Sequence, residues 1–483
     1  MKQLEKHKTP LERIVAPLAT QSNAHLVVPA ILVVAYMARL AVSFGSYSGQ
    51  GVSPMHGDFE AQRHWLELTQ HLPMREWYFY DLQYWGLDYP PLTAFHSYAL
   101  GKIGSLLNED WFTLDTSRGI ETYGVKLFMR HSVIASELLT YIPAVLLFSS
   151  LNKDTVLHRT VTTLTVLLQP AVLLIDHGHF QYNTVMLGLM TASLYFMMQG
   201  KVNLAAGAYV ACLAFKQMGL YYAPVVFAYL LSVTYQQPHR FVLLGMTTVA
   251  AFALFFGPFL LVGGVSGLQQ VIIRMFPFGR GLFEDKVANL WCAINVVYKL
   301  KAHIKGETLQ RMSLLFTLLG VLPASIKVFL KPQPKVLLLA TSSCAWAFFL
   351  FSFQVHEKSV LLPLLPTTLL LYSSHLYKSW IGYINIVAIF SLWPLLNKDG
   401  LGLQYAVLSL LWIWLCGFGQ STESMPIRAF HYATYLAMVA CHALEPFFAV
   451  SHLPDLWTVA NALVSFGAFA AFYLWTLYQL LLS

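Results

Sequence analysis

Charged residues are scarce in this chain of 483 residues. Lysine, arginine, aspartate and glutamate make up 11% of it, whereas soluble proteins carry about 25%. Hydrophobic residues account for 57%, and the mean hydropathy is +0.57. This balance excludes an ordinary soluble domain and predicts an all-α, polytopic membrane protein.

Several other features are missing. The cysteines number five, an odd count without zinc-site spacing, which excludes a disulfide framework. No Asn-x-Ser/Thr acceptor is present, and the polar, basic start at 1–10 is not a cleavable signal, so the first apolar run is expected to remain as an anchor. The net charge of +7 comes from basic residues scattered between apolar runs. That pattern favours loop charges that set topology over nucleic-acid binding.

Apolar runs occupy most of the chain, and each is close to the roughly 20 residues that a membrane-spanning helix needs. About fourteen are expected, at 25–44, 131–150, 157–175, 184–200, 203–218, 220–234, 240–262, 309–329, 335–352, 359–373, 379–394, 402–416, 427–445 and 457–481. The basic tail at 1–24 is expected in the cytoplasm, and basic residues recur in alternate turns. Both termini are therefore predicted to be cytoplasmic.

Two predicted loops, 45–130 and 263–308, are far longer than ordinary connections and are expected opposite the cytoplasm. They belong to a single membrane domain at 25–483. Inside the second loop, the apolar segment 287–300 ends in a basic run, which argues for a span, but its length fits an interfacial or re-entrant segment. We prefer the non-spanning interpretation, which places His356 on the same side of the membrane as Asp58.

The first loop contains a polar, acidic and aromatic stretch, with Gly-Asp-Phe-Glu-Ala-Gln-Arg-His-Trp at 57–65 and Tyr-Trp-Gly-Leu-Asp-Tyr-Pro-Pro at 84–91. A short amphipathic helix is expected at 58–71. Asp58 is either a general base or the N-cap of that helix, a position that aspartate favours. Asp88 precedes Tyr-Pro-Pro and fits a turn aspartate at least as well as a catalytic one.

Four further polar motifs interrupt the apolar runs. His177 and His179 have a spacing that can bind metal, although two histidines alone are a weak signal. Lys216 and the cluster at 354–358 are placed near the membrane, where charge is costly and usually functional. Arg280, with Arg274 and Lys286, fits either a phosphate clamp or an anchor for lipid headgroups.

Together these residues form one chemically dense face, open to two functions. A secondary transporter usually carries its charges near mid-membrane in broken helices, often in two related halves. Here the polar motifs cluster in long loops and at span ends, and no halves are visible. The pattern favours an enzyme that acts on a lipid-borne substrate.

The motifs at 57–65, 84–94, 176–183, 277–286 and 354–358 closely resemble the dolichyl-phosphate-glucose-dependent glucosyltransferases of the endoplasmic reticulum. They follow one another in the family's order from the first span to about residue 360, and the span pattern continues beyond. Gly86 favours the branch that adds the first glucose to the high-mannose lipid-linked oligosaccharide. The sister branch, which adds the second glucose, tends to carry another residue there.

The resemblance implies a GT-C fold with two long lumenal loops, and an inverting transfer without metal or other cofactor. Its donor is dolichyl-phosphate-glucose, its acceptor is the dolichyl-diphosphate-linked oligosaccharide, and its product has an α-1,3 linkage. It also implies a multi-pass protein of the endoplasmic reticulum membrane with a lumenal site. Asp58 matches the family's catalytic base; the residues assigned to substrate binding are Asp88, His179, Arg280, His356 and Lys358.

Overall fold

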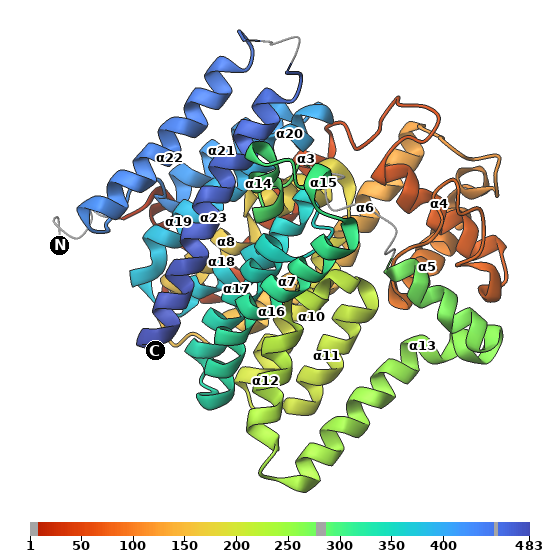
Figure 1. Ribbon diagram of the computed structural model, residues 1–483, viewed down its shortest axis with the longest axis horizontal. Helices are drawn as coiled ribbons and strands as arrows, with labels where there is room; N and C mark the ends of the chain where they lie inside the picture. Colours follow the sequence, from red (N-terminus) through yellow and green to blue (C-terminus); the bar gives the residue numbers. More distant parts are fainter. Residues whose placement is uncertain (1–7, 277–285, 449–452) are drawn as a thin grey trace.

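The computed structural model describes residues 8–276, 286–448 and 453–483, and within them every regular element is helical (Figure 1). The predicted all-α class is confirmed. The longer helices are α3 (Val27–Ser43), α4 (Asp58–His71), α5 (Pro91–Leu107), α6 (Tyr123–Leu139), α7 (Tyr141–Ser149), α8 (Val156–Leu167), α10 (Asn183–Met198), α11 (Val202–Phe215), α12 (Ala223–Thr234), α13 (Pro238–Met275), α14 (Leu290–Val297), α16 (Gly306–Leu330), α17 (Pro334–Phe351), α18 (Leu361–Leu369), α19 (Lys378–Ser391), α21 (Gly402–Cys416), α22 (Met425–Leu444) and α23 (Leu456–Leu482).

The predicted apolar runs coincide with these helices. In the described residues, eight helical segments are long and apolar enough to cross a membrane: Gln21–Ser43, Tyr123–Ser149, Val156–Phe180, Pro238–Met275, Gly306–Leu330, Pro334–Phe351, Lys378–Lys398 and Leu456–Leu482. Helices α10, α11 and α21 are apolar but shorter. The polytopic class is thus confirmed, whereas the count of fourteen spans stays a prediction.

Two details concern the predicted second loop. Helix α13 continues thirteen residues past its predicted end at 262, to Met275, because the sequence stays apolar and the chain only kinks at Gly264, where φ is +62°. Helix α14 has eight residues, a rise of about 12 Å against a hydrocarbon core about 30 Å thick. This helical length agrees with a segment that does not span, and the sidedness of 287–300 stays a prediction.

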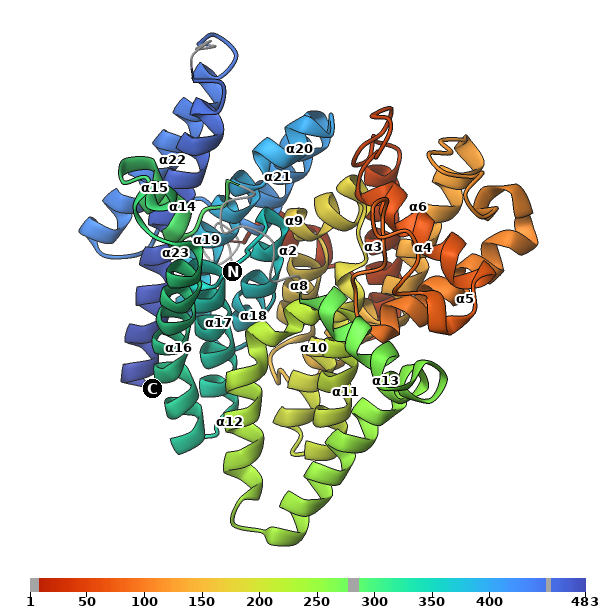
Figure 2. The same ribbon diagram turned by 45° about the vertical axis from the view of Figure 1, so that its right-hand side comes forward.

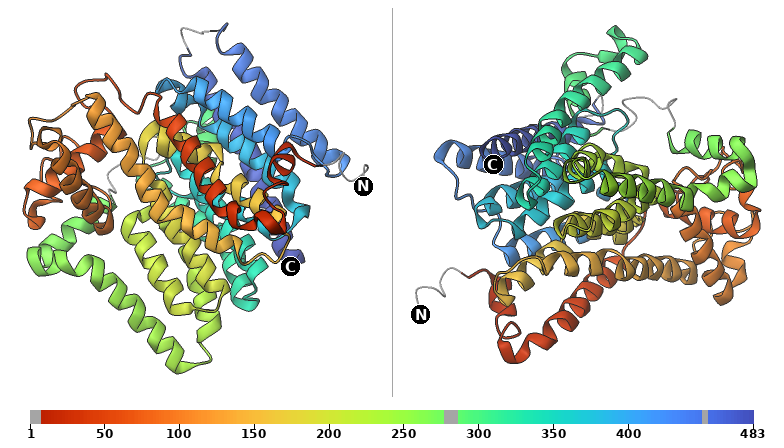
Figure 3. Two further views of the ribbon diagram at one scale, coloured as in Figure 1. Left: turned by 180° about the vertical axis from the view of Figure 1, so that it is seen from behind. Right: turned by 90° about the horizontal axis from the view of Figure 1, so that it is seen from below.

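Helices α4 and α5 form a lobe beside the main bundle, at the right of Figure 1. Helix α13 runs from the turn after α12 up to this lobe, and the two helices make a V (Figure 2). Phe259 of α13 packs against the lobe, with its ring centroid 5.3 Å from that of Tyr78 and 5.7 Å from that of Phe95. Figure 3 shows α3 lying along α6 at the back of the bundle and α22 on its outside.

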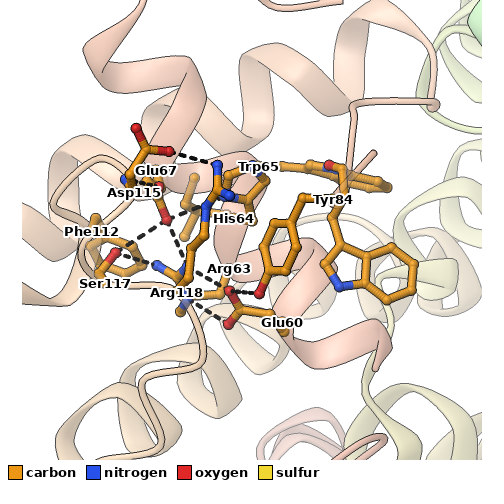
Figure 4. Close-up of polar contacts among 12 residues, drawn as sticks. Glu60, Arg63, His64, Trp65, Glu67, Tyr84, Phe112, Asp115, Ser117 and Arg118 are labelled. Atoms are coloured by element: carbon orange, nitrogen blue, oxygen red, sulfur yellow. Dashed lines mark hydrogen bonds and ion pairs between the residues drawn. The ribbon is translucent and has the colours of Figure 1, made fainter. Parts of the chain in front are cut away.

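A buried ionic network fixes α4 in the lobe (Figure 4). The Arg63 guanidinium donates to both Glu60 oxygens at 2.7 Å, to Glu67 Oε2 at 2.6 Å and to Ser117 Oγ at 2.8 Å. The backbone N–H of Asp115 donates to the other Glu67 oxygen at 2.7 Å. Burial raises the pKa of Glu67, but His64 and Arg63 lower it to about 2. Glu60 and Glu67 of the acidic stretch are therefore committed to the fold.

Candidate active site

A cavity of about 1020 Å³ opens beside the first residue of α4. Its walls come from segments that are far apart in the sequence: the loop 46–58 before α4, residues 356–358 after α17, and residues 394–399 at the end of the span Lys378–Lys398. His179, the last histidine of the π-helical segment η4 (Leu174–Phe180), also lines the cavity, as do Glu121, Lys286 and Thr458. Of the predicted site residues, Asp58, His179, His356 and Lys358 meet here.

The Asp58 carboxylate is anchored through one oxygen. The Lys358 ammonium and the Gln181 amide donate to Oδ2, and His179 Nε2 lies 3.0 Å from the same atom. Burial by itself raises the pKa of Asp58, but Lys358 and His179 outweigh it and hold the pKa well below its ordinary value. No described residue forms a hydrogen bond or ion pair with Oδ1, so an ionised carboxylate presents one uncommitted oxygen beside the cavity.

The alternative role of Asp58, as a helix cap, is not what the structure shows. The N-cap of α4 is Gly57, and Asp58 is the first helical residue. Its side chain makes no capping hydrogen bond, and its own N–H donates to Ser48 Oγ at 3.3 Å. The carboxylate is directed to Lys358 and His179 instead.

His179 lies between two carboxylates. Its Nδ1 is 2.5 Å from Asp399 Oδ2, on the opposite side of the ring from Asp58. The backbone reverses at the next residue, Phe180, whose φ of +91° is rare for a residue with a side chain. Such π-helical turns and strained residues are frequent at functional sites because they re-aim side chains. Asp399 thus fixes the ring that in turn supports Asp58.

A second row of polar groups lies behind Asp58. Lys216 Nζ donates to Asn183 Oδ1 at 2.6 Å and to Gln181 Oε1 at 3.4 Å, and lies 4.6 Å from the centre of the Tyr89 ring. Gln181 passes this contact on, because its amide nitrogen donates to Asp58. The buried Lys216 charge is therefore coupled to Asp58 through a single side chain.

Among the predicted residues, Asp88 and His177 do not line the cavity. Asp88 is half-buried, and its carbonyl accepts from Gln217 Nε2 at 3.5 Å. Arg280 lies outside the described residues. His177 points away from His179, with its Nε2 2.6 Å from Glu137 Oε2, so the two imidazoles do not converge on one point. In the described part of the chain no cluster of three His, Cys, Asp or Glu side chains is placed to hold a metal.

Asp399 and Gln181 were missed as functional residues. Gln181 belongs to the motif at 176–183, where the two histidines drew attention instead. Asp399 belongs to a polar Asn-Lys-Asp-Gly stretch between two apolar runs, and the alternation of turns predicts it on the side of Asp58. That turn was the available signal, but the pairing with His179 joins residues 220 positions apart.

Comparison with known proteins decides the family. The model of the ALG6, ALG8 glycosyltransferase family matches residues 33–475. The chain belongs to this family. It is 45% identical to the dolichyl pyrophosphate Man9GlcNAc2 alpha-1,3-glucosyltransferase of Saccharomyces cerevisiae, over 99% of this chain and 95% of that protein. It is 44% identical to the protein of the same name from Gallus gallus, over 80% and 77%.

Among solved structures, ArnT from Cupriavidus metallidurans in the apo state is similar over 95% of this chain and 77% of that one, with a TM-score of 0.46 and 14% identity. As a member of the ALG6, ALG8 family the chain is a membrane glycosyltransferase. Its cavity brings together an ionised carboxylate, Asp58, and the cationic side chains of Lys286, Lys358 and Lys398.

Proposed function

We propose that the protein transfers glucose from dolichyl-phosphate-glucose to the terminal mannose of the unglucosylated dolichyl-diphosphate high-mannose oligosaccharide, as the first glucose in an α-1,3 linkage. The names of relatives at 38–45% identity, dolichyl pyrophosphate Man9GlcNAc2 alpha-1,3-glucosyltransferases, support the acceptor and the linkage. The observation that carries the reaction is the Asp58 carboxylate, ionised and open at one oxygen beside a cavity of about 1020 Å³.

Asp58 acts as the general base. Oδ1 accepts the proton of the mannose 3-hydroxyl while that oxygen attacks the anomeric carbon of the donor glucose. The bond from that carbon to the phosphate oxygen breaks, and its electron pair leaves with dolichyl phosphate. Attack opposite the leaving group converts the β-linked donor into an α-linked product. Oδ2 stays bound to His179 and Gln181, so the carboxylate keeps its orientation.

Lys358 and His356 act on the donor phosphate. The leaving group gains one negative charge as its bond breaks, and cationic donors next to it lower the barrier. Lys358 is bonded to Asp58 before substrate arrives, and its ammonium has three protons to share. A phosphate in the cavity draws this ammonium away from Asp58, which strengthens the base when the donor is bound. Arg280 and Asp88 remain proposed substrate contacts.

We place this site in the lumen of the endoplasmic reticulum, in a GT-C arrangement, with both termini cytoplasmic and with the segments between α3 and α6 and between α13 and α16 lumenal. Two alternatives differ in their reaction. The sister enzyme adds the second glucose, and a transporter moves a lipid or solute without forming a bond. A network that holds one carboxylate oxygen and leaves the other open fits proton transfer better than transport.

The test is an in vitro transfer assay with the purified full chain in nanodiscs. Dolichyl-phosphate-glucose and dolichyl-phosphate-mannose are compared as donors, and unglucosylated and monoglucosylated oligosaccharides as acceptors. We expect product only from the glucose donor and the unglucosylated acceptor, and undiminished transfer in chelator. Product only from the monoglucosylated acceptor means the sister reaction, and a demand for dolichyl-phosphate-mannose refutes the donor. Loss in chelator, restored by a divalent ion, refutes the metal-free mechanism.

A further inference from the structure

A second cavity, of about 600 Å³, lies between the N-terminal segment, the start of α19 and the turn after α21. Lys8 and Thr9 contribute from the first of these segments, and Lys378 and Ser379 from the second. Trp414 and Phe418, on and after α21, supply an aromatic side. Nothing in the proposed reaction uses these residues.

This cavity and the Asp58 cavity lie at opposite ends of one span, Lys378–Lys398. Lys378 lines the second cavity at the beginning of that span, and Lys398 lines the first cavity at its end. Twenty-one residues rise about 30 Å as a helix, the thickness of the hydrocarbon core. The second cavity is therefore at the membrane face opposite the active site.

The walls of this cavity are closely packed parts of the fold. The N-terminal segment is fixed by a capping box, in which Glu12 N–H donates to Thr9 Oγ1 at 3.2 Å and Thr9 N–H donates to Glu12 Oε2 at 2.7 Å. Gly417 ends α21 with a φ of +64°, and a Cβ there would meet Thr9 Cγ2 at 2.9 Å. A side chain at Gly417 would thus close the gap between the two walls.

The charge of the cavity is positive. Lys8 and Lys378 line it, and none of its described lining residues is acidic. Within the described ranges neither ammonium forms an ion pair; Lys378 Nζ lies 5.8 Å from the centre of the Phe418 ring. Basic pockets between membrane helices on the cytoplasmic side are typical binding places for phosphorylated headgroups, and tryptophan favours the boundary between headgroups and acyl chains.

We propose that this cavity binds the phosphate-bearing headgroup of an anionic membrane lipid. Lys8 and Lys378 contact the phosphate, with Ser379 as a further hydroxyl donor. Trp414, a residue that is 59% exposed, borders the glycerol and acyl region. The inference goes beyond the transfer reaction, since it concerns a ligand at the other face of the membrane.

The experiment titrates a short-chain phosphatidylinositol into the detergent-solubilised full chain and follows the complex by native mass spectrometry. Binding should weaken about 25-fold in Lys8→Ala/Lys378→Ala, about fivefold for each lysine near a charged headgroup. The matched control is Lys335→Ala: Lys335 also lies over an aromatic ring, that of Tyr377, at 5.6 Å, but does not line the cavity. Lys335→Ala should bind the lipid with unchanged affinity, and so should Lys8→Arg/Lys378→Arg.

Two results overturn the proposal. If Lys335→Ala loses as much affinity for the lipid as the double alanine variant, the lipid is attracted to the basic face in general and not bound in this cavity. Inorganic phosphate that binds as tightly as the lipid, with the same loss in the double variant, assigns the cavity to free phosphate. Melting curves show whether the double alanine variant is folded. The variant Lys8→Arg/Lys378→Arg keeps both positive charges, so it must bind the lipid like the unchanged protein.

Discussion

At the scale of single residues, the proposed chemistry depends most on Asp58. Its two carboxylate oxygens have different surroundings: Oδ2 is bonded to Lys358, Gln181 and His179, and Oδ1 has no hydrogen bond or ion pair with a described residue. Such an asymmetric carboxylate is oriented before substrate binds, so little has to be reorganised when the acceptor hydroxyl arrives. The low pKa keeps it ionised throughout the neutral range.

Asp58→Asn should therefore abolish the base without removing the fold. Turnover should fall by about 10²–10⁴, the usual contribution of a general base, while the melting temperature in detergent changes little. The control is Asp81→Asn in the same loop, whose carboxylate pairs with Arg118 at 2.8 Å outside the cavity lining. Near-normal turnover of Asp58→Asn, measured with saturating substrates, contradicts the assignment.

Lys358→Ala should change the pH dependence in a defined direction. Burial raises the pKa of Asp58 and the Lys358 charge is the largest influence that lowers it, so its removal raises that pKa. A base with a raised pKa is protonated at higher pH, so the acidic limb of the kcat/KM profile moves upward. Lys398→Ala removes another cavity lysine that is not paired with Asp58. Lys398→Ala should leave the acidic limb of the kcat/KM profile unchanged. Equal shifts of this limb in both variants would refute the specific pairing of Lys358 with Asp58.

At the scale of elements, α4 shows how a polar helix is held beside a membrane bundle. Arg63 is fully buried and bonded to Glu60 and Glu67 on its own helix and to Ser117 in the loop before α6. A buried charge is tolerated only when it is paired and its hydrogen bonds are satisfied. Arg63 thus ties the helix that begins with Asp58 to the rest of the lobe.

Arg63→Ala should destabilise the lobe by about 3–5 kcal/mol, because it leaves two buried carboxylates without their counter-charge. We expect a lower melting temperature and faster proteolytic cleavage between 58 and 121. Arg75→Ala is the comparison, since the Arg75 side chain is 66% exposed and pairs with Glu76 only at 3.5 Å. It should change stability by no more than about 0.5 kcal/mol. Equal losses of stability in the two variants would show that the Arg63 network does not stabilise the lobe.

Elements were also the level at which sequence reasoning succeeded best. The helix expected at 58–71 is α4 with the same bounds, because Asp58 starts and His71 ends a continuous helical pattern. The apolar runs fall on helices because hydrocarbon leaves the backbone no other way to pair its polar groups. The Asp58 cavity was only partly predictable. Asp399 contacts His179, which lies 220 positions earlier in the sequence, and no local sequence pattern encodes such a pairing.

The whole molecule has two chemically different ends. Asp58, Lys358 and Asp399 share one cavity, and Lys8 and Lys378 share the other, joined by the span Lys378–Lys398. The orientation of the chain in the membrane therefore decides which compartment each cavity faces. Basic residues favour the cytoplasmic face, where anionic lipids are also enriched. This orientation depends on whether the segment 287–300 crosses the membrane. One additional crossing there would move every later loop to the opposite side.

Cysteine labelling in sealed microsomes tests that orientation. Cys292 and Cys441 are partly exposed and are first replaced by serine, whereas Cys212, Cys344 and Cys416 are buried. Single cysteines then replace exposed residues, with Asn108 and Lys305 expected to be lumenal and Lys153 and Gln236 cytoplasmic. Lys305 is decisive, because α14 and α15 (Leu300–His303) together are too short to bring it across a core about 30 Å thick. An impermeant reagent should label it only after the microsomes are opened; labelling of position 305 in intact microsomes would place Lys358 and Asp58 on opposite faces and exclude the shared site.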